Sequence, residues 1–512
     1  MTEFSKVVSM SKSERLQPRD DFNLQLEANV APAAWKNPVP SDRYNLVVIG
    51  AGTAGLVTAA GAAGLGAKVA LIERHLMGGD CLNFGCVPSK AVIGSARAAA
   101  AVRDAERFGI HSPHEPSVDF AAVMQRMRRL RAAISPNDSA ERFQELGVDV
   151  FLGDACFVNS DTVQVGDTKL KFRRAVIATG ARAVVPSIPG LSSVPYLTNE
   201  TLFSLTERPG RLGVIGAGPI GCEMAQAFAR LGSEVFLVET GHGILPKEDR
   251  DAAAIVEGSM KRDGVRLLCC GRDLQVDSSN GTQLVLTSHG NHQQFVDQLL
   301  ISTGRTPNVE ALKLDAVECR FRNSGAVVND YMQTTNPVIY AAGDVCSSSG
   351  FTTLPISVQG SVSLNALFRG RKRASSLVIP WCTYTSPEVA HVGLHERQAR
   401  EQNIEVDVYV QQLRDVDRAI LDGDEVGFVK VLVRKGTDRI LGATIVASHA
   451  GEMISEITLA MTHGLGLSNI GSTIHPYPTQ TDAIRKLGDQ YSRTRLTPLV
   501  KSLFQKWLKW TR

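Results

Sequence analysis

The chain has 512 residues, of which 43% are hydrophobic and 21% are charged, and its formal net charge is +3. This length exceeds one compact core and predicts several domains, and the small net charge gives no sign of a nucleic-acid partner. The nine cysteines are an odd, sparse set, which predicts a reducing compartment, hence the cytoplasm, rather than a disulfide framework. No run of 18 uncharged apolar residues occurs, so no membrane span is expected.

The first segment, residues 1–43, contains Pro18, Pro32, Pro38 and Pro40. Because proline interrupts regular structure, we predict an extended arm rather than a folded unit. Trp35 is its largest apolar side chain. We expect the arm either to lie on the folded body or to stay disordered.

A first nucleotide-binding pattern begins with a short apolar run at 44–49, followed by Gly50, Gly52 and Gly55 in the spacing GxGxxG. An alanine-rich run and a second apolar stretch follow, and Glu73 comes 18 residues after the last glycine. The glycines allow the backbone to approach a pyrophosphate at a helix start, and Glu73 is suited to bind a ribose. This order predicts a dinucleotide site, the alternative being a tight turn in an unrelated α/β protein.

Two cysteines, Cys81 and Cys86, follow closely and precede Val-Pro-Ser-Lys, in which Pro88 suits a first helical turn. In a regular helix they would be separated by about 7.5 Å of rise, beyond the roughly 4.4–6.8 Å that a disulfide accepts. A bridge therefore needs a local distortion, which Gly85 permits. We predict an accessible redox dithiol with one thiol held partly as thiolate by the helix N-terminus, the alternative being two structural cysteines.

A second pattern of the same kind contains Gly216, Gly218 and Gly221. Glu239 follows 18 residues after the last of them, so two dinucleotides are predicted. A carboxylate at Glu239 would bind a free 2′-hydroxyl and repel a 2′-phosphate, which favours NADH. The nearby His242 and Lys247 keep NADPH as the alternative.

Three further apolar strands end in polar or glycine-rich turns, at Ala178-Thr179-Gly180, at Gly304-Arg305-Thr306-Pro307-Asn308 and at Gly343-Asp344. Ligands bind at such strand ends in open α/β sheets, so we expect Asp344 to contact a bound cofactor rather than to act as a base. The vicinal pair Cys269-Cys270 is interpreted as structural.

From about residue 379, alternating strand patterns and a helix near 451–465 predict a separate α+β domain without a nucleotide signal. This domain contains the run Ile474-His475-Pro476-Tyr477-Pro478-Thr479-Gln480-Thr481-Asp482, in which a rigid Pro-X-Pro turn presents Tyr477. The alternative interpretation is a simple connecting turn.

The last segment, residues 491–512, is predicted to form a basic amphipathic helix. One face carries Leu499, Val500, Leu503, Phe504, Trp507 and Leu508. Three lysines lie elsewhere on the helix, and no acid follows Arg493. Residues 499–512 therefore suit peripheral contact with an anionic membrane, and packing against a partner subunit or the body is the alternative.

Together these motifs resemble those of the pyridine nucleotide-disulfide oxidoreductases, which include dihydrolipoamide dehydrogenase, glutathione reductase and mercuric reductase. The similarity covers about residues 44–490, and its most specific part is GGDCLNFGCVPSK. It implies an α/β fold with two Rossmann-like dinucleotide-binding domains plus a C-terminal α+β dimerisation domain. The expected division is an FAD-binding domain over 44–195 and 311–378, an NAD(P)-binding domain over 196–310 and a dimerisation domain over 379–490.

The resemblance also implies cofactors and roles. FAD is expected on the first glycine pattern and NAD(P)H on the second, with electrons passing through the flavin to a Cys81–Cys86 disulfide. Cys86 is then the thiol beside the flavin and Cys81 the thiol that attacks substrate. Lys90 and Glu223 occupy the positions of the family's ion pair beside the flavin ring. A homodimer is implied, in which the C-terminal turn of one subunit reaches the dithiol of the other.

The C-terminal turn departs from part of the family. Dihydrolipoamide dehydrogenases and glutathione reductases have His-Pro-Thr followed by Glu, whereas this chain has Tyr477-Pro478-Thr479 and Asp482, with His475 displaced. A phenol, with a pKa of about 10, is a poor proton shuttle at neutral pH. Mercuric reductases have a tyrosine here, but their paired C-terminal cysteines and N-terminal CxxC domain are missing from this sequence.

The leading hypothesis is therefore a homodimeric FAD enzyme that oxidises NADH through Cys81 and Cys86 and is most like mercuric reductase. A small-molecule acceptor is expected, either a disulfide or a metal–thiol complex, and no resident metal site is predicted. One alternative is a dihydrolipoamide dehydrogenase-like enzyme that uses His475 as its base. The other is an inactive flavoprotein that serves as a scaffold at a membrane surface.

Overall fold

The computed structural model describes residues 16–111, 117–239, 241, 243–269, 273–278, 283–286, 292–346, 362–368 and 370–512. The predictions that involve His242 and Cys270 lie outside these residues.

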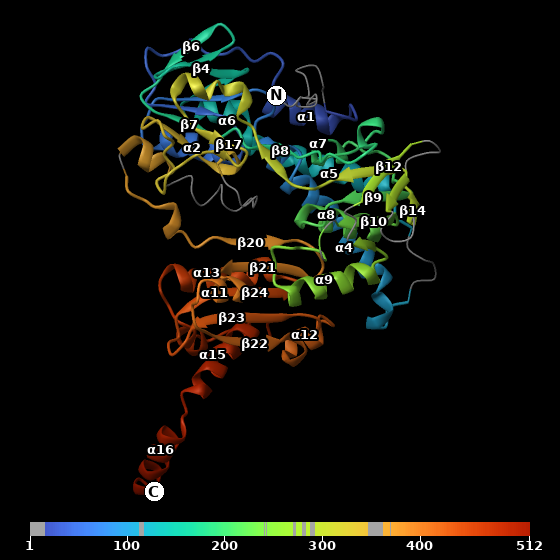
Figure 1. Cartoon of the computed structure of the whole chain (residues 1–512), viewed down its shortest axis with the longest axis vertical. Helices are drawn as coiled ribbons and strands as arrows, with labels where there is room; N and C mark the ends of the chain where they lie inside the picture. The colour runs from blue at the N-terminus through green and yellow to red at the C-terminus, as the bar shows by residue number, and fades with distance from the viewer. Residues whose placement is uncertain are drawn as a thin grey trace.

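A five-stranded parallel sheet forms the centre of the first dinucleotide-binding unit, in the order β19-β7-β1-β2-β3. Its strands are β1 (Leu46–Ile49), β2 (Val69–Glu73), β3 (Val148–Leu152), β7 (Ala175–Ile177) and β19 (Ile339–Ala341). All four residues of β1 are buried, as expected for a parallel strand covered on both faces. Because β19 comes from a much later part of the chain, this sheet is assembled from two separate segments (Figure 1).

Helices and a small antiparallel sheet cover the two faces of this first sheet. Helices α2 (Thr53–Gly64) and α6 (Ala140–Glu145) pack on its strands, whereas α3 (Gly79–Asn83), α4 (Cys86–Arg103) and α5 (Phe120–Ile134) pack on one another beside it. The small sheet consists of β4 (Ala155–Asn159), β5 (Thr162–Val165) and β6 (Thr168–Lys171). A core of buried aromatic and aliphatic side chains lies between the small sheet and the central one.

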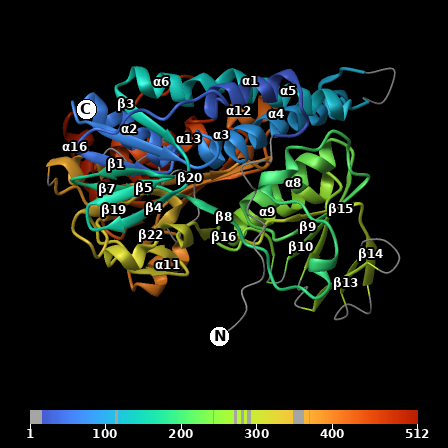
Figure 2. The ribbon, with the colours of Figure 1, turned by 90° about the horizontal axis from the view of Figure 1, so that it is seen from above.

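A four-stranded parallel sheet, in the order β11-β10-β9-β15, forms the second unit, which lies beside the first (Figure 2). Its strands are β9 (Arg211–Ile215), β10 (Glu234–Glu239), β11 (Arg266–Cys269) and β15 (Gln298–Ile301), and its helices are α7 (Asn199–Leu202), α8 (Pro219–Arg230) and α9 (Arg250–Arg262). An antiparallel sheet is added by β12 (Leu274–Asp277), β13 (Gln283–Leu286) and β14 (His292–Phe295). The two units are joined where β8 (Ala181–Ala183) pairs with β16 (Arg305–Pro307).

The third unit, drawn in orange and red, is built on an antiparallel sheet in the order β20-β21-β24-β23-β22 (Figure 1). Its strands are β20 (Pro380–Thr383), β21 (Glu388–Gly393), β22 (Val406–Gln412), β23 (Phe428–Arg434) and β24 (Ile440–Ala447). Its helices are α11 (Glu396–Glu401), α12 (Asp417–Leu421), α13 (Ala450–Thr462), α14 (Leu467–Ser472) and α15 (Asp482–Thr494). A hairpin of β17 (Phe321–Arg322) and β18 (Gly325–Ala326) precedes β19. Buried aliphatic residues from the antiparallel sheet of the third unit and from α13 to α15 form the core of that unit.

The N-terminal segment differs from the extended arm that we predicted, because it contains helix α1 (Asp21–Val30). Asp20 caps the helix by accepting a hydrogen bond from Asn23 N at 2.9 Å. The helix is held by α5, where Arg131 Nη2 donates to Asn23 Oδ1 at 2.7 Å. The same guanidinium donates from Nη1 to the carbonyl of Asn83 in the cysteine motif at 2.5 Å. Residues 16–43 lie on the body, as expected for this part of the segment, and Trp35 donates to Val150 O at 3.1 Å.

The chain ends in helix α16 (Pro498–Trp510), which projects away from the rest of the molecule (Figure 1). It begins seven residues after the predicted start at 491, because α15 continues to Thr494. Within the described residues, no helix is both long and apolar enough to cross a membrane.

Candidate active site

The two cysteines of the redox motif lie on two helices that meet at Gly85. Cys81 is in α3, and Cys86 is the first residue of α4. Gly85 leaves helical geometry, with φ −130° and ψ −107°, and a side chain there would come within 3.0 Å of the backbone oxygen of Asp80. The predicted local distortion is therefore present, and both cysteines are half-buried.

The two thiols share a hydrogen bond, and this bond, followed by burial, raises the pKa of Cys81 above its ordinary value. The negative charge of Asp80 raises it further, and a hydrogen bond with Thr53 opposes the shift. Cys86 begins an 18-residue helix, whose N-terminal partial positive charge stabilises a thiolate. The two thiols therefore lie in different environments, with Cys86 at the N-terminus of a long helix and Cys81 in the preceding short helix.

An ion pair lies one helical turn beyond Cys86, between α4 and α8. Lys90 Nζ is 2.8 Å from Glu223 Oε2, and the Glu223 side chain is only 6% exposed. The other carboxylate oxygen accepts the backbone N–H of Tyr384 at 2.9 Å. The Lys90 ammonium lies 4.3 Å from the centre of the Tyr384 ring, and burial raises the pKa of Tyr384 to about 12. The pair that the resemblance implied is thus formed, and Tyr384 is a neighbour that sequence reasoning missed.

Two glycines of the first nucleotide pattern, Gly50 and Gly55, are required by close contacts. Gly50 has φ +103°, and a Cβ on it would overlap the carbonyl of Ala178. A Cβ on Gly55 would overlap the carbonyl of Gly50. Helix α2 can therefore follow the turn this closely only because residue 55 is glycine. At Gly52 the nearest atom to an added Cβ would be Gly79 Cα at 3.7 Å. The backbone at Gly52 therefore borders an open space, here called a cradle, next to the cysteine motif. This arrangement suits the close approach of a pyrophosphate.

The second pattern repeats this geometry. A Cβ on Gly216 would lie 2.6 Å from the carbonyl oxygen of Ser302, and one on Gly221 would overlap Gly216 O. A Cβ on Gly218 would meet no described atom within 4 Å. The two patterns can therefore take the same kind of ligand.

The two acidic residues that follow the patterns occupy equivalent positions. Glu73 accepts hydrogen bonds from Ala51 N at 2.7 Å and from His75 N at 2.8 Å, and burial raises its pKa. Glu239 accepts from Ala217 N and Gly241 N, both at 2.9 Å. Each carboxylate is thus fixed by the turn that would hold the pyrophosphate.

Asp344 supplies a test of whether a flavin nucleotide fits the first site. Its Oδ1 atom is buried and has no hydrogen-bond partner among the described residues, and burial raises its pKa. Its Oδ2 atom is 3.5 Å from Arg305 Nε. An unpartnered buried carboxylate oxygen at a strand end needs a donor, and sugar hydroxyls supply one. The residues at the first site therefore fit FAD.

Asp80 connects the cysteine motif to the second unit, a contact that sequence reasoning missed. Its carboxylate accepts from Arg305 Nη1 at 3.0 Å and from Asn199 Nδ2 at 2.6 Å. Arg305, which the sequence predicted to contact a cofactor, also donates to Ala181 O at 2.5 Å. Among the described residues, Ala178-Thr179-Gly180 is held by Asn308, whose Nδ2 donates to Thr179 O at 3.0 Å. In the sequence, the only hint of the contact made by Asp80 was that a charged residue directly precedes Cys81.

The C-terminal turn lies on the third unit, and its hydrogen bonds go to that unit. Tyr477 is 74% exposed, and its hydroxyl donates to Asp417 Oδ2 at 2.8 Å, which raises the pKa of Tyr477. His475 has one ring nitrogen 2.8 Å from Glu456 Oε1 and the other 3.0 Å from Thr473 O. Burial would raise the pKa of Asp482, but ion pairs with Arg485 and a lysine lower it. Within one chain, the structure thus gives these residues partners other than the dithiol.

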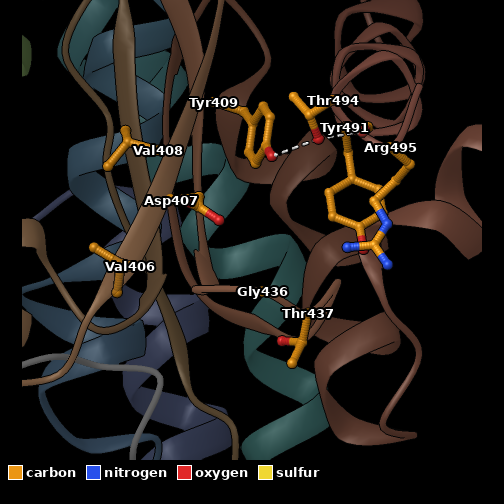
Figure 3. A pocket seen from close by; sticks show the side chains of 9 residues that line it. All are labelled: Val406, Asp407, Val408, Tyr409, Gly436, Thr437, Tyr491, Thr494 and Arg495. Carbon is orange, nitrogen blue, oxygen red and sulfur yellow. Dashed lines mark hydrogen bonds between the residues drawn. The ribbon is translucent and has the colours of Figure 1, made fainter. Parts of the chain in front are cut away.

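A separate cavity of about 510 Å³ lies in the third unit, between β22 and the end of α15 (Figure 3). Figure 3 shows Tyr409 and Thr494 joined by a hydrogen bond across it, with Arg495 beside them. None of the residues predicted for chemistry lines this cavity. In the described part of the chain, no group of three or more histidine, cysteine or acidic side chains is arranged to hold a metal ion.

The paired nucleotide cradles and the dithiol between them define a flavoprotein that handles a nicotinamide nucleotide. Residues 44–364 match the profile of the pyridine nucleotide-disulphide oxidoreductases, and residues 379–487 match the profile of their dimerisation domain. The chain belongs to this family.

Several named proteins are similar to the chain. It is 34% identical to a mercuric reductase of Lysinibacillus sphaericus over 450 residues, which is 87% of this chain and 82% of that protein. It is also 34% identical to a dihydrolipoyl dehydrogenase of Chlamydia muridarum over 449 residues, 86% of this chain and 95% of the relative. Among solved structures, the HOCl-induced flavoprotein disulfide reductase RclA from Escherichia coli has a TM-score of 0.76 at 28% identity, over 87% of this chain and 99% of RclA.

The family resemblance and the fold class predicted from the sequence are confirmed. The protein is an NAD(P)H-dependent flavin disulfide oxidoreductase of an FAD-binding family, and its dimerisation domain indicates a homodimer. The acceptor and the choice between NADH and NADPH are not fixed by the similarity, since relatives with two different names are equally identical to the chain.

Proposed function

We propose that this enzyme passes two electrons from NADH through Cys81 and Cys86 to a thiol-bound soft metal ion, as in the reduction of Hg(II) to Hg(0). The overall reaction is NADH plus Hg(II) giving NAD⁺, a proton and Hg(0). The observation that carries this choice is the C-terminal turn, where Tyr477 donates to Asp417 and both nitrogens of His475 are engaged.

This choice follows from the different needs of the two acceptors. Reduction of a disulfide releases a thiolate, and a nearby acid assists its departure. A metal ion that is held by thiolates accepts two electrons without taking a proton. A turn whose histidine has no free nitrogen, and whose phenol has a raised pKa, therefore suits a metal–thiol acceptor better than a disulfide.

The nucleotides would be held by the residues of the two cradles. FAD would be held by Gly50, Gly52, Gly55, Glu73, Ala178, Thr179, Gly180, Gly343 and Asp344. NADH would be held by Gly216, Gly218, Gly221, Glu239 and Gly304. FAD supplies the two-electron link between the nicotinamide and the dithiol. Glu239 would bind the adenine ribose, and its negative charge disfavours the 2′-phosphate of NADPH.

The side chains near the dithiol would have distinct roles. Cys86 would face the flavin as the thiolate, and Cys81 would meet the acceptor at the open side. Lys90, held by Glu223, would balance negative charge beside the flavin. Arg305 would act indirectly, by holding Asp80 next to Cys81.

In a homodimer, Tyr477 of the partner subunit would complete the acceptor site. Its support is the 74% exposure of Tyr477 on the dimerisation domain, which leaves its ring available to a second subunit. Asp482 would stabilise the start of α15 behind this turn through its ion pair with Arg485 at 2.8 Å. We place this chemistry in the cytoplasm, where the cysteine content suits a reducing environment.

The domain boundaries belong to the same proposal. They are an extension at 1–43, an FAD-binding domain at 44–195 and 311–378, an NAD(P)-binding domain at 196–310, a dimerisation domain at 379–490 and a terminal helix within 491–512. The return of β19 to the first sheet supports the two-segment FAD-binding domain.

The experiment compares NADH oxidation by the holoenzyme with Hg(II) in excess cysteine and with lipoamide. We expect turnover with the mercury complex, its loss in Cys81→Ser, and a marked fall in Tyr477→Phe. His475→Gln should leave the mercury rate unchanged. Faster turnover with lipoamide, abolished by His475→Gln, would overturn the choice of acceptor.

Disulfide reduction with His475 as the base is the second candidate, because His475 and Glu456 form a histidine–carboxylate pair at 2.8 Å. The bond from the other ring nitrogen to Thr473 O disfavours it. An inactive scaffold is disfavoured by the formed Lys90–Glu223 pair and by the adjacent thiols, since neither is needed for binding alone.

A further inference from the structure

Helix α16 is a regular helix with no part of the body packed over it. Thr497 caps it by accepting a hydrogen bond from Val500 N at 3.4 Å, and Pro498 occupies the first turn. All thirteen of its residues are described, and none is buried. Isolated helices of about this length are marginal in water, so a surface that covers α16 would stabilise it.

The side chains of α16 divide into two clean halves. At about 100° per residue, seven apolar residues fall within one half of the helix circumference. They are Leu499, Val500, Leu503, Phe504, Trp507, Leu508 and Trp510. Six of the seven are exposed by 55–77%, Val500 being half-buried, and the two tryptophan rings are in edge contact with centres 5.2 Å apart. This apolar face is continuous along the whole helix.

The opposite half of α16 and the link before it are basic. Six of the chain's 55 basic residues, and none of its 52 acidic residues, lie within residues 490–512. They are Arg493, Arg495, Lys501, Lys506, Lys509 and Arg512. Because the whole chain has a net charge of only +3, the remaining residues are net acidic. The positive charge is therefore concentrated on the segment with the exposed apolar face.

We propose that α16 binds the enzyme to the surface of an anionic lipid bilayer. The apolar half would enter the boundary between headgroups and acyl chains, with Trp507 and Trp510 in the interfacial layer. Lys501, Lys506 and Lys509 would extend their ammonium groups to the lipid phosphates. A flat lipid surface accepts all seven apolar side chains at once, and the concentration of basic residues selects anionic headgroups.

The dimer strengthens this inference. One short amphipathic helix binds a bilayer weakly and reversibly, but a homodimer presents two. Where both helices of the dimer reach the same bilayer, binding of the first keeps the second at a high local concentration near the surface and raises the overall affinity. Helix α16 projects from the third unit, away from helix α4 of the same chain, which begins at Cys86 (Figure 1).

The test is co-sedimentation of the holoenzyme with vesicles of phosphatidylcholine alone or mixed with phosphatidylglycerol. We expect binding to the mixed vesicles, little binding to phosphatidylcholine alone, and weakening at high salt. Replacing one lysine by glutamine should lower the partition coefficient about fivefold. A chain truncated after Arg495 should lose binding and keep its rate of NADH oxidation.

A matched pair of variants separates insertion from simple charge attraction. Leu503→Glu with Trp507→Glu places two acids on the apolar face, and Ser502→Glu with Gln505→Glu places the same charge on the polar face. We expect the first pair to abolish vesicle binding and the second to weaken it only partly. Equal loss in both pairs, or undiminished binding after truncation, would overturn the proposal.

Size measurement by light scattering addresses the other occupants of this face. We expect the truncated protein to remain dimeric. If truncation dissociates the dimer, α16 covers a second copy of the chain and the membrane proposal is wrong. The membrane proposal is also wrong if the full chain binds no vesicle but is retained by an acidic protein.

Discussion

The ion pair between Lys90 and Glu223 allows a quantitative prediction. Glu223→Gln keeps the volume and the oxygen that accepts Tyr384 N–H, but it removes the negative charge 2.8 Å from Lys90 Nζ. Lys90→Met removes the positive charge and keeps an aliphatic chain over the Tyr384 ring. The two changes together remove the pair without leaving either charge alone.

The size of the effect follows from burial. Removing one partner of a fully buried ion pair costs about 3–5 kcal/mol, because an unpaired charge is left behind. Glu223 is 6% exposed, but Lys90 is 36% exposed, so water screens the lysine and reduces the cost. We expect each single variant to lose about 1–3 kcal/mol and the double variant to lose less than the sum, with a coupling energy of about 1–2 kcal/mol.

The assay is urea unfolding of the holoenzyme, followed by the release of bound flavin. The shift of the midpoint, multiplied by the slope of the unmodified protein, gives each change in the free energy of unfolding. Lys261→Met is a control, because this exposed lysine pairs with Glu257 within one helix and such pairs contribute little. Additive losses in the double variant would show that Lys90 and Glu223 do not interact, and would refute the reasoning.

Three other predictions concern the nucleotide sites and the contacts of the third unit. Gly221→Ala should impair folding of the second unit, because the added Cβ overlaps Gly216 O. In Gly218→Ala the added Cβ meets open space, so this variant should fold normally and raise KM for NADH. Equal behaviour of the two variants in circular dichroism and kinetics would contradict this prediction. Glu239→Gln should lower KM for NADPH by about tenfold, since a like charge near the 2′-phosphate is removed, and an unchanged ratio of kcat/KM for the two nucleotides would count against it. Burial acts to raise the pKa of Asp249, but His395 and Lys430 outweigh it and hold the pKa below its usual range. The carboxylate therefore stabilises the fold above its unfolded pKa of about 3.9 and loses this effect as pH falls, so Asp249→Asn should lower the unfolding midpoint at pH 7 and converge with the unmodified protein in acid.

The parts of the site that the sequence predicted are those encoded by short, local patterns. Gly50, Gly55 and Glu73 lie within one strand–turn–helix–strand unit, and their spacing reflects backbone contacts that only glycine permits. Gly85 was predictable for the same reason, because two cysteines in one uninterrupted helix are too far apart to bond. The pair of Lys90 and Glu223 needed the family resemblance, since 133 residues separate its partners.

The features that sequence reasoning missed depend on distant contacts. Asp80 binds Arg305 from 225 residues away, and no local pattern pairs them. Helix α1 was obscured by the prolines around it, and it is stabilised by Arg131, whose guanidinium joins Asn23 to the cysteine motif. Burial of that guanidinium lowers the pKa of Arg131 to about 10, which reflects the depth of this contact. The segment before the first strand is therefore part of the support of the dithiol.

The most direct test of the central claim is an anaerobic titration of the purified holoenzyme with NADH, followed by its absorption spectrum. If Cys86 is the thiolate beside the flavin, a long-wavelength absorption from the thiolate to the flavin should develop in the unmodified protein. It should persist in Cys81→Ser and be absent in Cys86→Ser. Reduction of the flavin without any such band in the unmodified protein would contradict electron transfer through the Cys81–Cys86 pair.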